Sequence, residues 1–174
     1  RLEGLLAGLR GLGPAMDTVR PMRSTDLGQV HMDPPEPVPA LGGGMLLGAL
    51  TAGAVADVVA ATTDGPGRAL IGTEIRRLGG PVARARAEGL ACAVQAEGVL
   101  FAVGIAASPE LAAATAAGVD DVRSACGPHA AEYGLVNFSA ESDPATSIFR
   151  PDDLARLTAV ADRFDPDGRF VRRL

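Results

Sequence analysis

The chain has 174 residues, of which 47% are hydrophobic and 21% charged, a composition typical of a folded globular domain. The net charge is −5 and aromatic residues make up only 3%, which argues against binding to nucleic acid or to an anionic membrane surface. There is no apolar run of membrane-spanning length and no recognisable signal peptide, so we predict a cytoplasmic location.

The N-terminal half predicts helix, strand, helix and strand in that order. Residues 1–12 carry leucines on one stripe, as in an amphipathic helix. Three glycines lead into a short expected strand at 45–47. Thr51 can cap a helix over 52–62, and residues 68–78 alternate as in a strand.

The strand at 68–78 has one polar face. Gly72, Glu74 and Arg76 point to the same side because successive side chains in a strand alternate. That face could line a cleft, or it could simply face water as one side of an antiparallel sheet. The pattern leaves both interpretations open.

The next segment predicts a β-hairpin and a helix. Alternation over 90–94, a glycine turn, and an apolar run over 99–106 are typical of a hairpin with a buried second strand. Ser108 followed by a proline marks a helix start. At the end of this helix, Cys126 and His129 have metal-ligand spacing, but no second ligand pair accompanies them, so no metal site is predicted.

The last third predicts a strand and a helix. Residues 133–137 form a short apolar run, and a helix follows over 151–164 with an apolar stripe expected to be buried. Together these elements predict an α+β fold, an antiparallel β-sheet with helices packed on one face.

Several segments together resemble a known family. The chain is similar to the berberine-bridge-enzyme-type C-terminus of FAD-linked oxidases, members of the vanillyl-alcohol-oxidase (PCMH-type FAD) superfamily. The similarity covers nearly the whole chain and occurs in the same order as in bacterial members. The segments that carry it are Leu9–Pro14 with Asp17–Val19, the Asp33–Pro35 crossing, Glu74–Arg84, Tyr133–Ala140 and Phe164–Phe170.

The resemblance implies a protein that works with FAD. In this family an N-terminal domain holds most of the cofactor, and we expect that such a domain precedes Arg1. Residues 1–132 would then be the substrate (cap) domain, and residues 133–174 the segment that returns to the FAD domain. The implied reaction is oxidation of a small organic substrate by hydride transfer to the flavin.

The resemblance also implies roles for six residues. Asn137 and Phe138 would lie near the cofactor. The residues that would face the substrate are Glu74, Arg76, Phe101 and Leu135. Many members have a tyrosine where this chain has Leu135, which cannot move a proton. The general base is therefore not identified, and Glu74 is the one candidate in this chain.

Two further expectations follow. The isolated chain should be inactive without its FAD-binding domain, and exposed apolar sheet surface should favour homo-oligomers. The alternative hypothesis is a non-catalytic remnant or binding module that folds without a cofactor.

Overall fold

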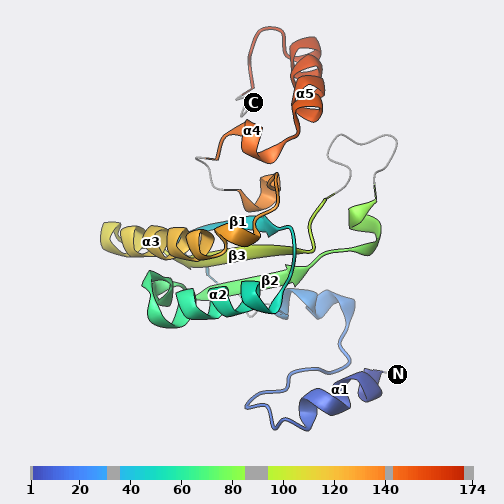
Figure 1. Ribbon diagram of the computed structural model, residues 1–174, viewed down its shortest axis with the longest axis vertical. Helices are drawn as coiled ribbons and strands as arrows, with labels where there is room; N and C mark the ends of the chain where they lie inside the picture. The colour runs from blue at the N-terminus through green and yellow to red at the C-terminus, as the bar shows by residue number, and fades with distance from the viewer. Residues whose placement is uncertain (1, 31–35, 85–93, 140–142, 171–174) are drawn as a thin grey trace. The chain divides into compact units, whose positions relative to one another are not determined.

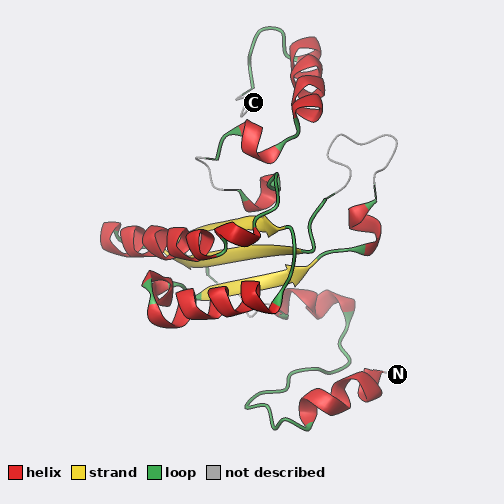
Figure 2. Cartoon of the chain, in the orientation of Figure 1, coloured by secondary structure: helices red, strands yellow, loops and turns green. Residues whose placement is uncertain are grey.

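The computed structural model of the chain describes residues 2–30, 36–84, 94–139 and 143–170. The predicted α+β class is confirmed: one antiparallel sheet accompanies several helices (Figure 2). Residues 1–37 and 38–174 form two compact units. The predicted functional division between residues 132 and 133 stays a prediction. Within the described ranges, none of the helices combines the length and the apolar character needed to cross a bilayer.

The first unit contains the predicted N-terminal helix. Helix α1 spans Leu2–Arg10, and a short 3-10 helix, η1, spans Ser24–Gln29. The Arg10 guanidinium donates to the carboxylates of Glu3 at 2.5 Å and Asp17 at 2.6 Å. These contacts raise the pKa of Arg10, with Asp17 the larger cause. In α1, Leu2, Leu5 and Leu9 are exposed and Leu6 is half-buried.

The second unit is built on a three-stranded sheet (Figure 1). Strands β1 (Ala40–Leu47) and β2 (Gly72–Arg77) both pair antiparallel with the central strand β3 (Gly98–Ile105). The three glycines before residue 45 were expected to precede a strand, but they lie inside β1. Strand β3 has a neighbour on each side. The hairpin strand expected at 90–94 lies, apart from residue 94, outside the described residues.

The described residues of this unit also form helices and short 3-10 helices. The principal helices are α2 (Ala52–Asp64), α3 (Pro109–Ala125) and α5 (Pro151–Phe164). Both predicted N-caps are confirmed, since Thr51 Oγ1 accepts from the backbone N–H of residue 54, and Ser108 Oγ from that of residue 111. The short elements are η2 (Pro66–Ala69), η3 (Gly80–Ala83), η4 (Gly127–His129), η5 (Val136–Phe138) and α4 (Ala145–Ile148).

The core lies between the sheet and helices α2 and α3, which run along the strand direction in Figure 1. Leu100 and Ala102 on β3 point into it, because they occupy alternate positions of one strand face. The core cluster comprises Leu47, Val58, Ala61, Leu100, Ala102, Val119, Val122 and Cys126. One face of the sheet is therefore covered by helices, as predicted.

Thr115 is the one polar member of the buried stripe of α3. Its side chain is 2% exposed, and its hydroxyl donates to the carbonyl of Ile105 at 2.7 Å. This bond satisfies a backbone oxygen at the end of β3, where the ladder stops. Gly104 lets the two elements approach, since a Cβ there would lie 2.6 Å from Thr115 Oγ1.

The prediction of a strand at 133–137 is wrong. The chain there forms a turn and then the 3-10 helix η5. Local bonds replace a ladder: the N–H of Gly134 donates to Ser147 O at 2.8 Å, and the N–H of Phe138 donates to Leu135 O at 2.8 Å. The apolar run alone could not distinguish these two outcomes.

Helix α5 has the predicted start but not the predicted burial. None of its residues is buried, and Phe164 is 72% exposed. The helix ends in a turn held by Asp165, whose carboxylate accepts from the N–H groups of Arg169 at 2.7 Å and Phe170 at 3.1 Å. Gly168 takes the positive φ of 64° that this turn requires.

Candidate functional site

The uncovered face of the sheet carries three of the six predicted site residues, Glu74, Arg76 and Phe101. Glu74 on β2 lies opposite Phe101 on β3, which in turn lies opposite Gly44 on β1. Paired residues of an antiparallel ladder point to the same side. Because Leu100 and Ala102 point to the helices, Glu74 and Phe101 point to the other face.

This face is only partly shielded. Along β3 the residues toward the helices are buried, whereas Phe101, Val103 and Ile105 are half-buried. The β1 partners of Phe101 and Val103 are Gly44 and Gly42, and a Cβ on Gly42 would lie 3.0 Å from the Phe101 ring. Because these glycines have no side chains, the Phe101 ring can lie over β1. The result is a low apolar surface, from which no β1 side chain projects at these two positions.

Phe138 connects the C-terminal segment to this face. Its ring packs edge-on against Phe101, with centroids 5.6 Å apart and an interplanar angle of 76°. Such pairs contribute about 0.5–1.5 kcal/mol beyond the area they bury. The Phe138 carbonyl also lies close to Gly44, 3.2 Å from the place a Cβ would take. The segment from Leu135 to Ser139 is thus attached at the edge of β1.

Arg76 completes the cluster. Its guanidinium forms an ion pair with Glu74 on the same strand and lies 5.5 Å from the centroid of the Phe138 ring. Both charged side chains are partly exposed, so the ion pair and the cation–π contact each contribute about 1 kcal/mol or less. Their effect is mainly to hold Arg76 over the ring.

Four of the six predicted residues therefore meet in one cluster, which we call the open-face cluster: Glu74, Arg76, Phe101 and Phe138. Asn137 is exposed in η5 beside Phe138, and nothing in the structure assigns its side chain a partner within this cluster. Leu135 is half-buried, and its carbonyl accepts from Ser139 Oγ at 2.9 Å. Leu135 therefore supports η5 locally.

The side chains of the open-face cluster are suited to binding a ligand, but they are not by themselves a set of catalytic groups. Two aromatic rings and the apolar residues of β3 offer a surface for a flat apolar group. Arg76 and Glu74 add hydrogen-bond donors and acceptors at its margin. The Glu74 carboxylate is the one group in the cluster that can take a proton, and it is ion-paired with Arg76.

A second polar arrangement was not predicted. His129 Nε2 lies 2.7 Å from Asp57 Oδ2, which connects η4 to α2 across 72 residues of sequence. Burial, and then the Asp57 carboxylate, raises the pKa of the Cys126 thiol. Cys126 belongs to the core. Within the described ranges, no group of three His, Cys, Asp or Glu side chains could hold a metal ion.

Sequence reasoning also missed an ion pair between Arg123 and Asp143. Arg123 Nη2 donates to both carboxylate oxygens of Asp143, at 3.0 and 3.2 Å. The two residues are 20 positions apart, and each had an ordinary local explanation, one in a helix and one in a turn. No periodicity or motif could have paired them.

We found no match between the chain and models of known protein families, and none among curated proteins.

Proposed function

We propose that this chain is the substrate-domain and C-terminal part of an FAD-dependent oxidoreductase that oxidises a small organic substrate. An FAD-binding domain preceding these residues would hold most of the cofactor. The observation that carries the proposal is the open-face cluster. Four residues assigned by resemblance to substrate or cofactor, and drawn from three separate elements, converge on the sheet face that the helices leave uncovered.

The chemistry of the cluster fits part of this cofactor. A planar ring system can lie against a low apolar surface, and the glycines of β1 keep the surface around Phe101 low. Phosphate groups need cations or N–H donors, but Arg76, the cation of the cluster, is already paired with Glu74. The cluster therefore suits the ring and the substrate, with the phosphates held by the other domain.

Each residue then has a limited role. When bound, the flavin would accept a hydride from the substrate. Phe101 and Phe138 would exclude water from the reacting atoms and support the substrate's apolar part. Arg76 would orient a polar substituent through its remaining N–H donors. Glu74 is positioned to accept a proton if the substrate binds within hydrogen-bond reach of it.

A visible absorption spectrum tests the cofactor. The chain would be produced together with the protein sequence encoded before Arg1, and its fold checked by circular dichroism. A flavin band that stays with the protein through desalting supports the proposal. A folded protein with no flavin band, even after incubation with FAD, refutes it.

Steady-state kinetics of that longer protein test the site. Replacing Arg76 with alanine should raise KM for the substrate about ten- to a hundredfold, because a charged hydrogen bond contributes about 1.5–3 kcal/mol. Replacing Arg77 with alanine is the matched control, since Arg77 pairs with Gly98 in the register and points to the opposite side of the strand. Equal effects of both variants would exclude a site on this face.

A non-catalytic binding module is the second candidate. It is favoured by the ion-paired state of Glu74 and by the absence of a proton-transferring group at Leu135. Such a module would fold without flavin and would show no substrate-dependent flavin reduction. Tight flavin binding together with reduction under anaerobic conditions would exclude it.

Self-association is a further part of the proposal. Val160, Phe164 and Phe170 are exposed near the C-terminus, and so are most leucines of α1. Exposed apolar side chains of this size favour homo-oligomers. Light scattering after size exclusion should give a mass above that of one chain, and a single-chain mass at high concentration would contradict this expectation.

A further inference from the structure

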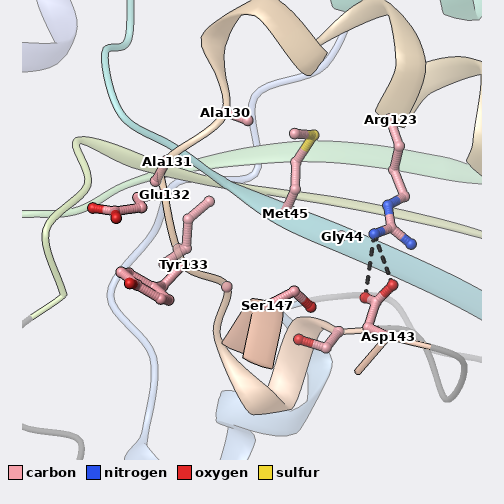
Figure 3. A pocket seen from close by; sticks show the side chains of 12 residues that line it. Gly44, Met45, Arg123, Ala130, Ala131, Glu132, Tyr133, Asp143 and Ser147 are labelled. Atoms are coloured by element: carbon pink, nitrogen blue, oxygen red, sulfur yellow. Dashed lines mark hydrogen bonds and ion pairs between the residues drawn. The ribbon is translucent and has the colours of Figure 1, made fainter. Parts of the chain in front are cut away.

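Strand β2 forms one edge of the sheet. In the part of the chain that the structure describes, β3 is the one strand that pairs with it. The other edge strand, β1, is partly covered, because the N–H of Ala131 donates to Leu46 O at 2.8 Å. Residues 130–134 and 44–46 also line a small pocket there (Figure 3). An edge strand leaves one row of N–H and C=O groups without a ladder partner, and such a row can pair with a further strand.

The hydrogen-bond pattern shows which backbone groups of β2 face this edge. The N–H of Leu78 donates to Glu97 O at 2.8 Å, in register with the ladder between β2 and β3. The backbone groups of successive residues in an antiparallel strand point to opposite sides of the strand. Since residue 78 bonds toward β3, residues 76, 74 and 72 do so too. The N–H and C=O groups of residues 73, 75 and 77 therefore point to the outer edge.

A second copy of β2 can pair antiparallel with this edge. The backbone groups match only when outward-pointing residues of one strand lie opposite those of the other, so the two-fold axis has to pass through a pair of identical residues. Two such registers pair five of the six residues of β2, one centred on Glu74 and one on Ile75. The first puts Glu74 opposite its own copy, and like charges directly opposite each other are destabilising. The second puts Glu74 opposite Arg76 of the second copy, and Arg76 opposite Glu74.

The charged side chains are accessible for this pairing. Both lie on the open face of the sheet, with 37% of the Glu74 side chain and 49% of the Arg76 side chain exposed. In the register centred on Ile75 they form non-hydrogen-bonded pairs, whose Cα atoms are about 4.5 Å apart and whose side chains come closest. Arg76 Nη2 pairs with Glu74 of its own strand. Because a guanidinium has five N–H donors, the same side chain can also bind a carboxylate of the second copy.

We propose that two copies of this chain associate edge to edge through β2, in the register centred on Ile75. Their two three-stranded sheets would become one continuous antiparallel sheet. The open-face clusters of both copies would lie on the same side of it, because paired residues of a ladder point to the same side. The inference rests on the self-association part of the proposed function and specifies its surface. One pair of strands buries less surface than a permanent dimer does, so dimer and monomer should be in concentration-dependent exchange.

Charge reversal in the whole chain tests the pairing, with sedimentation velocity over a range of protein concentrations as the readout. Glu74→Arg puts arginine opposite arginine, and Arg76→Glu puts glutamate opposite glutamate. Each variant alone should dimerise about tenfold more weakly, or worse, than the unchanged chain. An equal mixture of the two variants should recover dimerisation, because every charged pair again joins opposite charges. Circular dichroism checks that each variant is folded.

Arg77→Glu is the matched control for these variants. It makes the same change of charge as Arg76→Glu, but on the opposite face of β2, where the register places residue 77 opposite Thr73. It should weaken dimerisation less than Arg76→Glu does. Equal weakening by Arg76→Glu and Arg77→Glu would overturn the proposal, and so would a mixture of Glu74→Arg and Arg76→Glu chains that stays monomeric.

Disulfide trapping tests the register without reversing a charge. Glu74→Cys chains would be mixed with Arg76→Cys chains under oxidising conditions, and the linked peptides would be identified by mass spectrometry. In the proposed register the two introduced thiols lie directly opposite each other, within the span of a disulfide. The other charged pair of the interface stays intact. A link from position 74 to position 76 should therefore dominate, whereas a dominant link from 74 to 74 would assign the other register and overturn the proposal.

These outcomes are separate from those of the flavin tests. A single-chain mass of the unchanged protein at high concentration would overturn both the β2 interface and the self-association expected above, and it would leave the flavin band and the KM effects as they are. An oligomer that persists in Glu74→Arg and Arg76→Glu alike would keep the self-association but overturn β2 as its surface.

Discussion

Replacing Gly104 with alanine should destabilise the protein, because α3 already occupies the space that the new methyl group would need. The added Cβ would lie 2.6 Å from Oγ1 and 2.8 Å from Cγ2 of Thr115. Thr115 cannot turn away without loss, because its side chain is buried and its hydroxyl is bonded to Ile105 O at 2.7 Å. Overpacking of this kind costs about 1–3 kcal/mol, of which alanine's lower backbone entropy cost offsets about 0.5–1 kcal/mol.

The partner substitution gives the sharper test. Thr115→Ala alone should cost about 1–3 kcal/mol, since it leaves the Ile105 carbonyl without its donor. In the double variant the close atoms at 115 are gone. The remaining Cβ–Cβ contact, 3.2 Å before any adjustment, needs a shift of only tenths of an ångström. The alanine at 104 should then cost almost nothing extra, so the two effects should differ from additivity by about 1–2 kcal/mol.

Urea unfolding followed by far-UV circular dichroism measures the four corners of this cycle. Gly72→Ala is the control, because a Cβ there would meet only Val103 Cγ1, at an ordinary 3.6 Å. It should change the free energy of unfolding by about 0.5 kcal/mol or less. Additivity within about 0.5 kcal/mol, or equal effects of the 104 and 72 substitutions, would refute the close packing of β3 against α3.

Three other predictions follow from single contacts. Asp165→Ala should speed amide exchange in the turn after α5 while the sheet stays protected, because that carboxylate accepts two backbone N–H groups; uniform change across the protein would contradict this. The folded-state pKa of Cys126 is raised above its ordinary value of 9.0. The stability linked to this thiol is therefore complete below that pH and lost as the pH rises through the folded pKa. Cys126→Ala should flatten the alkaline decline in unfolding free energy, and an unchanged decline would show that the thiol is not its source. Alanine at His129 and at Asp57 should show a coupling of about 0.5–1 kcal/mol in urea unfolding, and additivity would mean that the pair forms no net interaction.

The helices and their starting points could be predicted because their signals are local. Thr51 and Ser108 each precede an apolar periodic run, and each side chain accepts the expected backbone hydrogen bond. Thr115 was recognisable as the polar member of the α3 stripe. Its partner, the Ile105 carbonyl, was not, because that contact depends on how α3 packs against β3.

Two predictions failed where local signals are ambiguous. The run at 133–137 has strand composition, but Gly134 and Leu135 use their backbone groups in bonds to Ser147 and Phe138. A strand also needs a neighbour with a free edge, and composition cannot supply this information. The apolar stripe of α5 gave the correct helix and the wrong burial. Periodicity shows that a face is apolar, but it does not show that another element covers it.

The open-face cluster was predicted only in part for the same reason. The alternation along β2 placed Glu74 and Arg76 on one side, but it could not choose between a cleft and water. The register of the sheet decides what lies beside them. It puts Phe101 opposite Glu74, and η5 then brings Phe138 onto Phe101 and under Arg76.

The side chains on the two faces of β3 differ in burial. One face can therefore belong to the core while the other stays available for binding, even in so small a sheet. Toward the helices, Leu100 and Ala102 are buried, and changes there alter stability. On the other face, Phe101 and Val103 are only half-buried, so part of their apolar surface can still be covered by a ligand or another domain. Because that surface contributes little to the core, substitutions at Phe101 should affect binding more than folding. A larger loss of stability than of binding on Phe101→Ala would assign this face to the core instead.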